Sequence, residues 1–301
     1  MTNALYALFK RNFPYAVREE ETAFDILGSA ENRIFARRDE AGNLIAAAVV
    51  HKNNILLLCV NEEHRGRGIG SALLKEAEAF IRECGYKSVT IGAGDDYLTP
   101  GVPVREMPFE EEIENMDLKY DLPRNNARFF MKRGYIHDWG DCNCFDMRMP
   151  FSSAVSSLSE FETPGIVYRW AKSEDIPSVI DCVNAAHPDF SEYYREEDAY
   201  EDDSVNKILI ALDGELVVGT LMVDQETEGK GVGSIGCTTV RPSHQGRKIA
   251  ANMIIKGAKH LYASGMKEGF LGYTYSGLDK LYGVAGYRVC AFYFMAKKDM
   301  N

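Results

Sequence analysis

A glycine-rich turn that joins a strand to a helix is the feature that most constrains this chain. Residues 55–60 form an apolar run that predicts a strand, and residues 73–81 carry the apolar spacing of a helix. Between them, Gly66, Gly68 and Gly70 alternate along the turn. Glycine allows the backbone to turn sharply and to approach a ligand closely. The unpaired N–H groups and the dipole at the start of a helix favour an anion, so the turn predicts a phosphate site.

The spacing of the turn excludes two common nucleotide-binding loops. A nucleotide P-loop needs the pattern Gly-x-x-x-x-Gly-Lys-Ser/Thr, which this turn does not have. A dinucleotide-binding fold needs Gly-x-Gly-x-x-Gly, and here the third glycine comes one residue early. Arg65 and Arg67 add positive charge to the turn, which keeps a phosphate ligand as the prediction.

The pattern Val60-x-x-x-x-Arg65-x-x-Gly68-x-Gly70 after a strand resembles the acyl-CoA loop of the GCN5-related N-acetyltransferase (GNAT) superfamily. The resemblance implies that the loop cradles the CoA pyrophosphate. It also implies that the backbone of residues 58–60 lines the pantetheine arm, where one N–H polarises the thioester carbonyl. The residues that it assigns to acetyl-CoA in this half are Leu58, Cys59, Val60, Arg65, Gly66, Arg67, Gly68, Ile69, Gly70, Ser71 and Asn126.

The loop occurs a second time, about 180 residues further along the chain. Residues 240–250 follow a strand-like run and open a helix pattern, in the same frame as the first loop. Lys248 stands where the first loop has Gly68, and Ala250 stands where it has Gly70. By the same resemblance the candidate cofactor-binding residues of this half are Thr238, Val240, Gln245, Gly246, Arg247, Lys248, Ile249 and Ala250.

The elements around the two loops repeat as well. A hairpin pattern precedes each loop, over residues 34–50 and 207–223. A short helix that ends in Gly-Tyr and is followed by a strand comes after each loop, over residues 125–149 and 277–296. These segments resemble the closing half of a GNAT domain. The second half also shows a first strand at residues 166–170, whereas the first half opens with a helix-like stretch and no visible first strand.

We therefore expect an α/β chain of two tandem GNAT domains, each a mixed β-sheet flanked by helices. The predicted domains are residues 1–151 and 166–301, joined by a linker at 152–165 that is rich in Ser, Thr and Glu and ends in Pro-Gly. At 301 residues, the chain has room for two ordinary domains.

The first half carries an acidic insertion. Arg65 and Gly134 are 69 residues apart, whereas Gln245 and Gly286 are 41 apart. The extra residues fall within 95–123, which holds nine acidic and two basic residues. A connection of this length inside a compact domain is more often functional than not. In GNAT folds it lies near the acceptor, so we interpret it as a substrate-facing lid, with a solvated surface loop or an inter-domain contact as the alternative.

Composition limits the classes of partner. A net charge of −11 argues against nucleic acid or an anionic membrane surface, and it is compatible with a cationic substrate such as an amine. The sequence shows neither a signal-peptide pattern nor an apolar run long enough to span a bilayer. Seven scattered cysteines are typical of reduced thiols, so we expect a cytoplasmic protein. Cys142-x-Cys144 lacks a second ligand pair, so we expect core packing and no metal site there.

The candidate catalytic residues are divided between the halves. The usual acid of the family is a tyrosine five residues before the closing aromatic residue of the Gly-Tyr pair. That position holds Tyr282 in the second half and Phe130, which has no hydroxyl, in the first. Glu62 and Asp95 end strands near the expected acceptor and are the candidate bases, with Glu63 and Asp96 beside them. His64 and His244 occupy matching loop positions, which favours a packing role.

Each half thus lacks one part of the family's pattern, and three interpretations stay open. The first half catalyses without a tyrosine, the second half is the enzyme, or both are active. We expect acetyl-CoA-dependent transfer of an acetyl group to the amine of a small molecule or peptide, by direct attack in a ternary complex. The alternatives are a non-catalytic acyl-CoA-binding or sensing module and, more narrowly, a mycothiol-type biosynthetic enzyme. The sequence is compatible with a monomer or a homodimer, and it leaves the acceptor and the length of the acyl group open.

Overall fold

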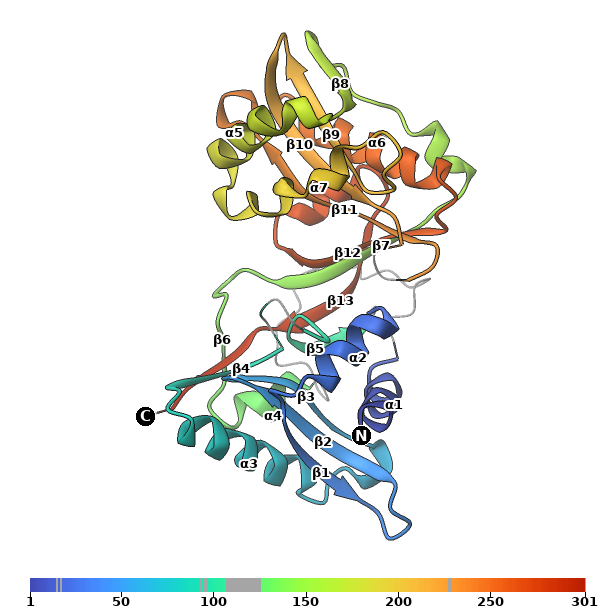
Figure 1. Ribbon diagram of the computed structural model, residues 1–301. Helices are drawn as coiled ribbons and strands as arrows, with labels where there is room; N and C mark the ends of the chain where they lie inside the picture. Colours follow the sequence, from blue (N-terminus) through green and yellow to red (C-terminus); the bar gives the residue numbers. More distant parts are fainter. Residues whose placement is uncertain are drawn as a thin grey trace. The chain divides into compact units, whose positions relative to one another are not determined.

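A computed structural model describes residues 1–14, 16, 18–92, 94, 97–106, 126–226 and 229–300 of the chain. The chain divides into two compact units. Unit 1 comprises Met1–Asp146 and Cys290–Asn301, and unit 2 comprises Met147–Val289. Both units are mixed sheets with helices packed against them, as the sequence predicts (Figure 1).

Unit 1 begins with two helices before its first strand. Six of its strands form a sheet in the order β1-β2-β3-β4-β14-β6. A further strand, β5, pairs with residues 291–294 of β13. The elements are α1 (Thr2–Asn12), α2 (Glu20–Gly28), β1 (Arg33–Arg38), β2 (Leu44–His51), β3 (Asn54–Val60), α3 (Ile69–Glu83), β4 (Ser88–Ile91), β5 (Val102–Glu106), α4 (Ala127–Met131), β6 (Ile136–His137), β7 (Cys144–Pro150), β13 (Arg288–Phe294) and β14 (Ala296–Asp299).

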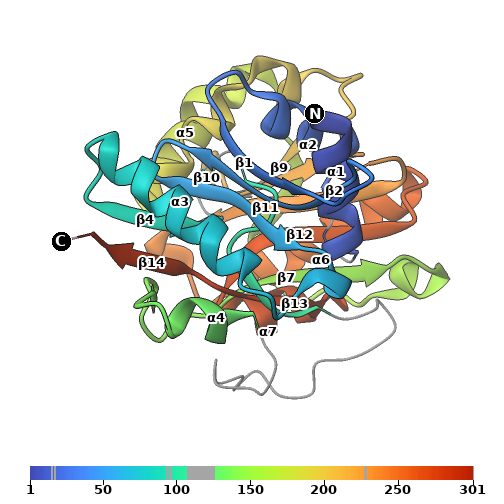
Figure 2. The ribbon, with the colours of Figure 1, turned by 90° about the horizontal axis from the view of Figure 1, so that it is seen from below.

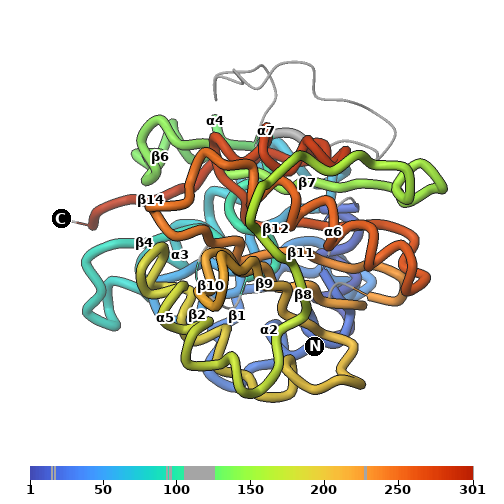
Figure 3. Tube along the Cα trace, turned by 90° about the horizontal axis from the view of Figure 1, so that it is seen from above, coloured from blue at the N-terminus to red at the C-terminus, as the bar shows by residue number. Residues whose placement is uncertain are grey.

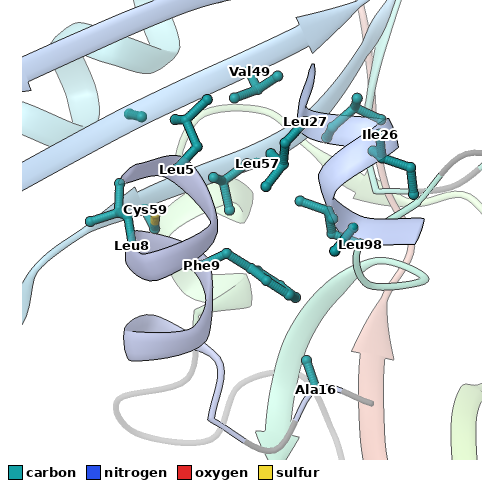
Figure 4. Packing of buried hydrophobic residues seen from close by; sticks show 13 residues of the cluster. Leu5, Leu8, Phe9, Ala16, Ile26, Leu27, Val49, Leu57, Cys59 and Leu98 are labelled. Atoms are coloured by element: carbon teal, nitrogen blue, oxygen red, sulfur yellow. The ribbon is translucent and has the colours of Figure 1, made fainter. Parts of the chain in front are cut away.

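The core of unit 1 lies where α1 and α2 cover one face of β2 and β3. Leu5, Leu8 and Phe9 of α1 pack with Ala47 and Val49 of β2, and all are buried (Figure 4). The alternate β2 residues are buried too, because α3 covers the opposite face (Figure 1). A strand covered on both faces needs a nearly continuous apolar run, which the sequence of β2 provides.

Unit 2 repeats this arrangement with a first strand in place of the N-terminal helices. Its strands follow the order β7-β12-β11-β10-β9-β8. The predicted strand at residues 166–170 is present as β8. The elements are β8 (Ile166–Trp170), α5 (Ile176–Ala186), β9 (Lys207–Asp213), β10 (Leu216–Asp224), β11 (Val232–Val240), α6 (Ile249–Ala263), β12 (Glu268–Tyr275) and α7 (Leu278–Gly283), with short 3₁₀ turns between them.

The closing strands of the two halves are exchanged. β14, from the end of the chain, pairs antiparallel with β4 through Lys297 and Thr90 (Figures 2 and 3). It also pairs with β6 through Ala296 and His137. Residues 147–150 of β7 belong in turn to unit 2, where β7 is the neighbour of β12. The compact units therefore differ from the predicted ranges 1–151 and 166–301 at the strand that closes each sheet.

In each sheet, one parallel pair of strands separates soon after it begins. β3 and β4 pair at Asn54 with Thr90 and at Ile55 with Ile91. β11 and β12 pair at Val232 with Glu268 and at Gly233 with Gly269. Beyond these pairs, β3 runs on to Val60 and β11 to Val240. The two units thus share an opening in the sheet just before the predicted CoA loop.

His137 fixes the exchanged strand in unit 1. Its Nδ1 accepts a hydrogen bond from the Met295 N–H at 3.0 Å, so Nε2 donates to the Cys142 carbonyl at 2.9 Å. Burial lowers the pKa of His137, because the charged imidazolium is poorly solvated there. A protonated Nδ1 could not accept the bond from Met295. The hydrogen bond from Met295, the residue just before β14, therefore requires a neutral imidazole.

We predict that His137 makes the stability of the protein fall in mild acid. The pKa is lower in the folded state than the ordinary value of about 6.5, so the contribution is present above that pH and is lost as the pH falls through the folded-state pKa. His137→Phe keeps a ring beside Phe294 but loses both hydrogen bonds, which should cost about 1–3 kcal/mol at neutral pH. Urea midpoints between pH 7.5 and 5.5 check this. Equal pH slopes in the wild type and the variant would contradict it.

Candidate functional site

A cavity of about 600 Å³ opens in unit 1 where β3 and β4 separate. Residues 56–60 of β3 line one wall, and Ile91 and Gly92 at the end of β4 line another. The cavity continues to the glycine loop at the start of α3. Of the residues predicted to bind the cofactor, it brings together Leu58, Cys59, Val60, Arg65, Gly66, Gly68, Ile69, Gly70, Ser71 and Asn126.

The backbone of the loop has the form that an anion site needs. Gly66 and Gly68 have positive φ angles of 75° and 82°, in the left-handed region that favours glycine. Gly68 is the N-cap of the 15-residue helix α3. The N–H groups of Ile69, Gly70 and Ser71 have no acceptor inside the helix, and these three residues line the cavity. The helix dipole adds partial positive charge at the same end.

The two arginines of the loop differ in their roles. The Arg65 side chain donates to the Val60 carbonyl at 2.8 Å and to Asn12 Oδ1 at 2.9 Å, so it ties the loop to β3 and α1. Arg67 is exposed, lies outside the cavity lining and donates to the Glu63 carbonyl at 3.2 Å. Arg65 therefore shapes the cavity, whereas a direct contact of Arg67 with a ligand stays a prediction.

Part of the predicted acidic lid forms a wall of the cavity. Leu98, Thr99, Gly101, Val102 and Pro103 all belong to its lining. This segment packs tightly on the end of β4, since a Cβ at Gly92 would lie 2.6 Å from the Thr99 carbonyl oxygen. Asn126 donates to the Pro103 carbonyl at 3.1 Å and connects the segment to α4. Asp95 and residues 107–123 of the predicted lid lie outside the described residues.

The structure adds lining residues that the sequence analysis did not select. They come from α1 and from the region of α4, and they are Phe9, Asn12, Phe13, Phe129 and Arg133, while Phe130, at the position of the family's acid, lines the cavity as well. No spacing in the sequence indicates them, because their position depends on how α1 and α4 pack on the sheet. Phe130 is 6% exposed, so an aromatic ring without a hydroxyl takes the place of the family's tyrosine.

Apart from its arginines, the titratable side chains in the described lining of this cavity are the imidazole of His64 and the thiol of Cys59. Among the described lining residues there is no carboxylate and no tyrosine. Burial raises the pKa of the Cys59 thiol to about 12, so it is a neutral thiol at physiological pH. The predicted base Glu62 is exposed on the 3₁₀ turn that precedes the loop and lies outside the lining. A role for Glu62 or Asp95 as base therefore stays a prediction.

The second loop has the same backbone with different side chains. Lys248 is the N-cap of α6 with φ 65° and ψ 12°, close to the 82° and −6° of Gly68. Gln245 donates to the Val240 carbonyl at 3.1 Å, as Arg65 does to Val60. A lysine therefore holds the left-handed conformation that the first loop assigns to glycine.

Both cations of the second loop have partners within unit 2. Arg247 donates to Asp213 at 3.2 Å and to the Pro164 carbonyl at 3.3 Å. The Lys248 ammonium lies 5.4 Å from the centre of the Phe161 ring. His244 lies 3.2 Å from the same Asp213 carboxylate, which supports the packing role expected for this histidine. The predicted linker thus packs beside the second loop.

Tyr282 lies beside an irregularity in β11. The pairing of β10 with β11 shifts register between Thr220 and Met222, and Cys237 opposite the shift has a φ of 47°. The Tyr282 hydroxyl is 3.3 Å from Thr238 Oγ1. Burial raises the pKa of Tyr282 to about 12, so the hydroxyl keeps its proton at physiological pH and could act as an acid.

The model of the acetyltransferase (GNAT) family matches residues 2–100 and 168–280, which is more than half of the chain. The protein belongs to the GNAT family, with one match in each half. No curated protein sequence matches the chain significantly. Among the described residues, no helix has the length and apolar character needed to cross a bilayer.

Solved structures show the same tandem fold at low sequence identity. The glucosamine N-acetyltransferase region of a fungal multi-domain β-N-acetylglucosaminidase matches with a TM-score of 0.69 and 17% identity, over 98% of this chain and 36% of that one. A GNAT protein of Sphaerobacter thermophilus matches with 0.64 and 18%, over 98% and 91%. A tandem GNAT protein of clavulanic acid biosynthesis matches with 0.61 and 14%, over 99% and 94%. At these identities the likeness shows the fold alone.

We predict that Gly68→Glu weakens CoA binding roughly a hundredfold or more, because it places a carboxylate at the anion site. A matched control is Gly42→Glu in the hairpin turn of the same unit. Gly42 has a similar φ of 85°, and at both positions a Cβ would meet no atom within 4 Å. The control therefore adds the same charge and backbone strain outside the cavity. Calorimetric titration checks the pair, and equal affinities in the two variants would contradict the assignment.

Proposed function

We propose that the protein is an acetyl-CoA-dependent N-acetyltransferase whose unit 1 binds the acyl donor. The observation that carries this proposal is the cavity that joins the unpaired part of β3 to the first turn of α3. The backbone of Leu58, Cys59 and Val60 would lie along the pantetheine arm. The N–H groups of Ile69, Gly70 and Ser71 would bind the pyrophosphate.

Acetyl-CoA supplies a thioester that a neutral amine can attack directly. The chain would contribute proximity, by holding donor and amine in one cavity, and an N–H of β3 that stabilises negative charge on the carbonyl oxygen. The acceptor would be the amine of a small molecule or peptide. Because one structural relative is a glucosamine N-acetyltransferase region, we propose glucosamine as the first acceptor to test.

For the proton transfers we propose residues in different parts of the chain. Tyr282 would be the acid if unit 2 is active, since its hydroxyl is protonated and close to Thr238. Glu62 and Asp95 stay the proposed bases of the first half. General acid help contributes roughly 10²–10⁴-fold, so unit 1 could also react slowly without a tyrosine.

A second candidate function is a non-catalytic module that binds or senses acyl-CoA. It is favoured by the cavity lining, in which the described residues include neither a carboxylate nor a tyrosine. Such a module would bind acetyl-CoA with the same residues and would turn over no amine.

We predict a stoichiometry of one acetyl-CoA per chain in a calorimetric titration. The cavity described above borders the first loop, whereas the cations of the second loop contact Asp213, Pro164 and Phe161. Two sites per chain would show that the Lys248 loop is competent. Release of free CoA with glucosamine and a panel of amines then separates the two functions, because a sensing module binds the donor and releases no CoA above the amine-free rate.

We predict that Tyr282→Phe lowers the turnover number by roughly 10²–10⁴-fold if unit 2 catalyses. Tyr287→Phe is the matched control, because the buried Tyr287 hydroxyl has no hydrogen-bond partner among the described residues and its loss should not slow the reaction. With a pKa of about 12, Tyr282 should cause no loss of rate between pH 7 and 10. An unchanged rate in Tyr282→Phe, with the amine panel active on the wild type, would remove it from the mechanism.

A further inference from the structure

The guanidinium of Arg133 lies at the end of the cavity that borders the glycine loop, and its own contacts fix its position. Arg133 follows Lys132, the C-cap residue of α4, and it lines the cavity. Its Nη2 donates to Ser71 Oγ at 2.6 Å, and its Nη1 donates to the Phe129 carbonyl at 2.6 Å. Ser71 belongs to the first turn of α3, so the guanidinium lies beside the N–H groups of the proposed anion site.

The guanidinium is held in place before any ligand binds. Its carbon lies 3.7 Å from the centre of the Phe129 ring, which is a close cation–π contact. The Phe129 ring would itself touch a Cβ at Gly70, at 3.7 Å, so the stack lies against the glycine loop. Within the described part of the chain, its hydrogen bonds use two of the five N–H donors of an arginine and leave the others for a ligand.

The charge of Arg133 is not neutralised within the described part of the chain. Its hydrogen-bond partners are a hydroxyl and a carbonyl, and none of the described carboxylates forms an ion pair with it. An arginine that only joined α4 to α3 would need no position in the cavity wall. A positioned guanidinium with free donors is the usual recognition group for a phosphate.

Unit 2 lacks each member of this arrangement. Ala285 precedes Gly286-Tyr287 as Arg133 precedes Gly134-Tyr135, and it is fully buried. Ala251 stands at the position of Ser71, and Leu281 stands at that of Phe129. The two loops have the same backbone conformation. They differ in the arginine, the serine and the phenylalanine, which are present in unit 1 and would favour a strongly anionic ligand there.

We propose that Arg133 is a phosphate-binding residue of the acyl-CoA site, positioned by Ser71 and Phe129, and that it selects the phosphorylated ligand. This inference rests on the proposed function. The phosphate is either the pyrophosphate or the 3′-phosphate of CoA, and the two sources share the same recognition chemistry.

The test is a calorimetric titration of the full chain with CoA and with 3′-dephospho-CoA. Arg133→Gln should weaken CoA binding at least about tenfold and should flatten the dependence of affinity on salt, because one phosphate contact is lost. Arg133→Lys keeps the charge without the fork and should be intermediate. Lys132→Gln removes the charge of the exposed neighbour and is the matched control, with affinity expected within about twofold of the wild type.

The outcomes distinguish the pyrophosphate from the 3′-phosphate as the partner of Arg133. They also distinguish failure of this inference from failure of the proposed acyl-CoA site. If Arg133→Gln weakens the binding of CoA but binds 3′-dephospho-CoA as tightly as the wild type does, Arg133 contacts the 3′-phosphate. If the variant binds both ligands less tightly than the wild type does, Arg133 contacts the pyrophosphate. Wild-type affinity in Arg133→Gln overturns the inference. Weaker binding with an unchanged salt dependence also overturns it, because that result means a packing role. If the wild type binds neither ligand, the acyl-CoA site itself is wrong, and the inference is lost with it.

Discussion

The separation of β3 from β4 is the constraint on which the site in unit 1 depends. A strand inside a sheet normally satisfies its N–H and C=O groups on both sides, and buried groups without a partner are costly. β3 pairs with β2 from Asn54 to Val60, whereas its pairs with β4 are at Asn54 and Ile55. The backbone of the remaining residues borders the cavity. An extended ligand with amide groups, such as pantetheine, could complete this edge as a further strand would.

Other contacts of unit 1 keep this opening in shape. Arg65 binds the Val60 carbonyl at the end of β3, which fixes the strand to the loop. Segment 97–103 packs on Gly92 at the end of β4 and continues into β5. On the other edge of β4, β14 pairs antiparallel with Ser88, Val89 and Thr90, so β4 is held there even though its pairs with β3 are at Asn54 and Ile55. Contacts at the end of β3, at the glycine loop and along β4 therefore maintain the opening between β3 and β4.

The sequence was sufficient for the local elements and for the first loop. The hairpins, both loops and the Gly-Tyr ends lie within a few residues of their predicted positions, because turn residues and apolar periodicity act over short distances. The partners of the closing strands were not predictable, since a pattern that indicates a strand at the end of residues 277–296 does not indicate its sheet. The same limit explains why the sequence does not indicate Phe9, Phe129 and Arg133 as cavity residues, because helix packing places them there.

The exchange of closing strands has a consequence for how the two halves can be separated. β14 completes the sheet of unit 1 from about 200 residues away in the sequence, so that sheet closes only after the rest of the chain exists. A cut in the linker at 152–165 would leave each half without its native closing strand and with a strand that belongs to the other sheet. An edge exposed in this way invites wrong pairing. The activity of either unit is therefore best dissected by point substitutions in the full chain, where both sheets keep their closing strands.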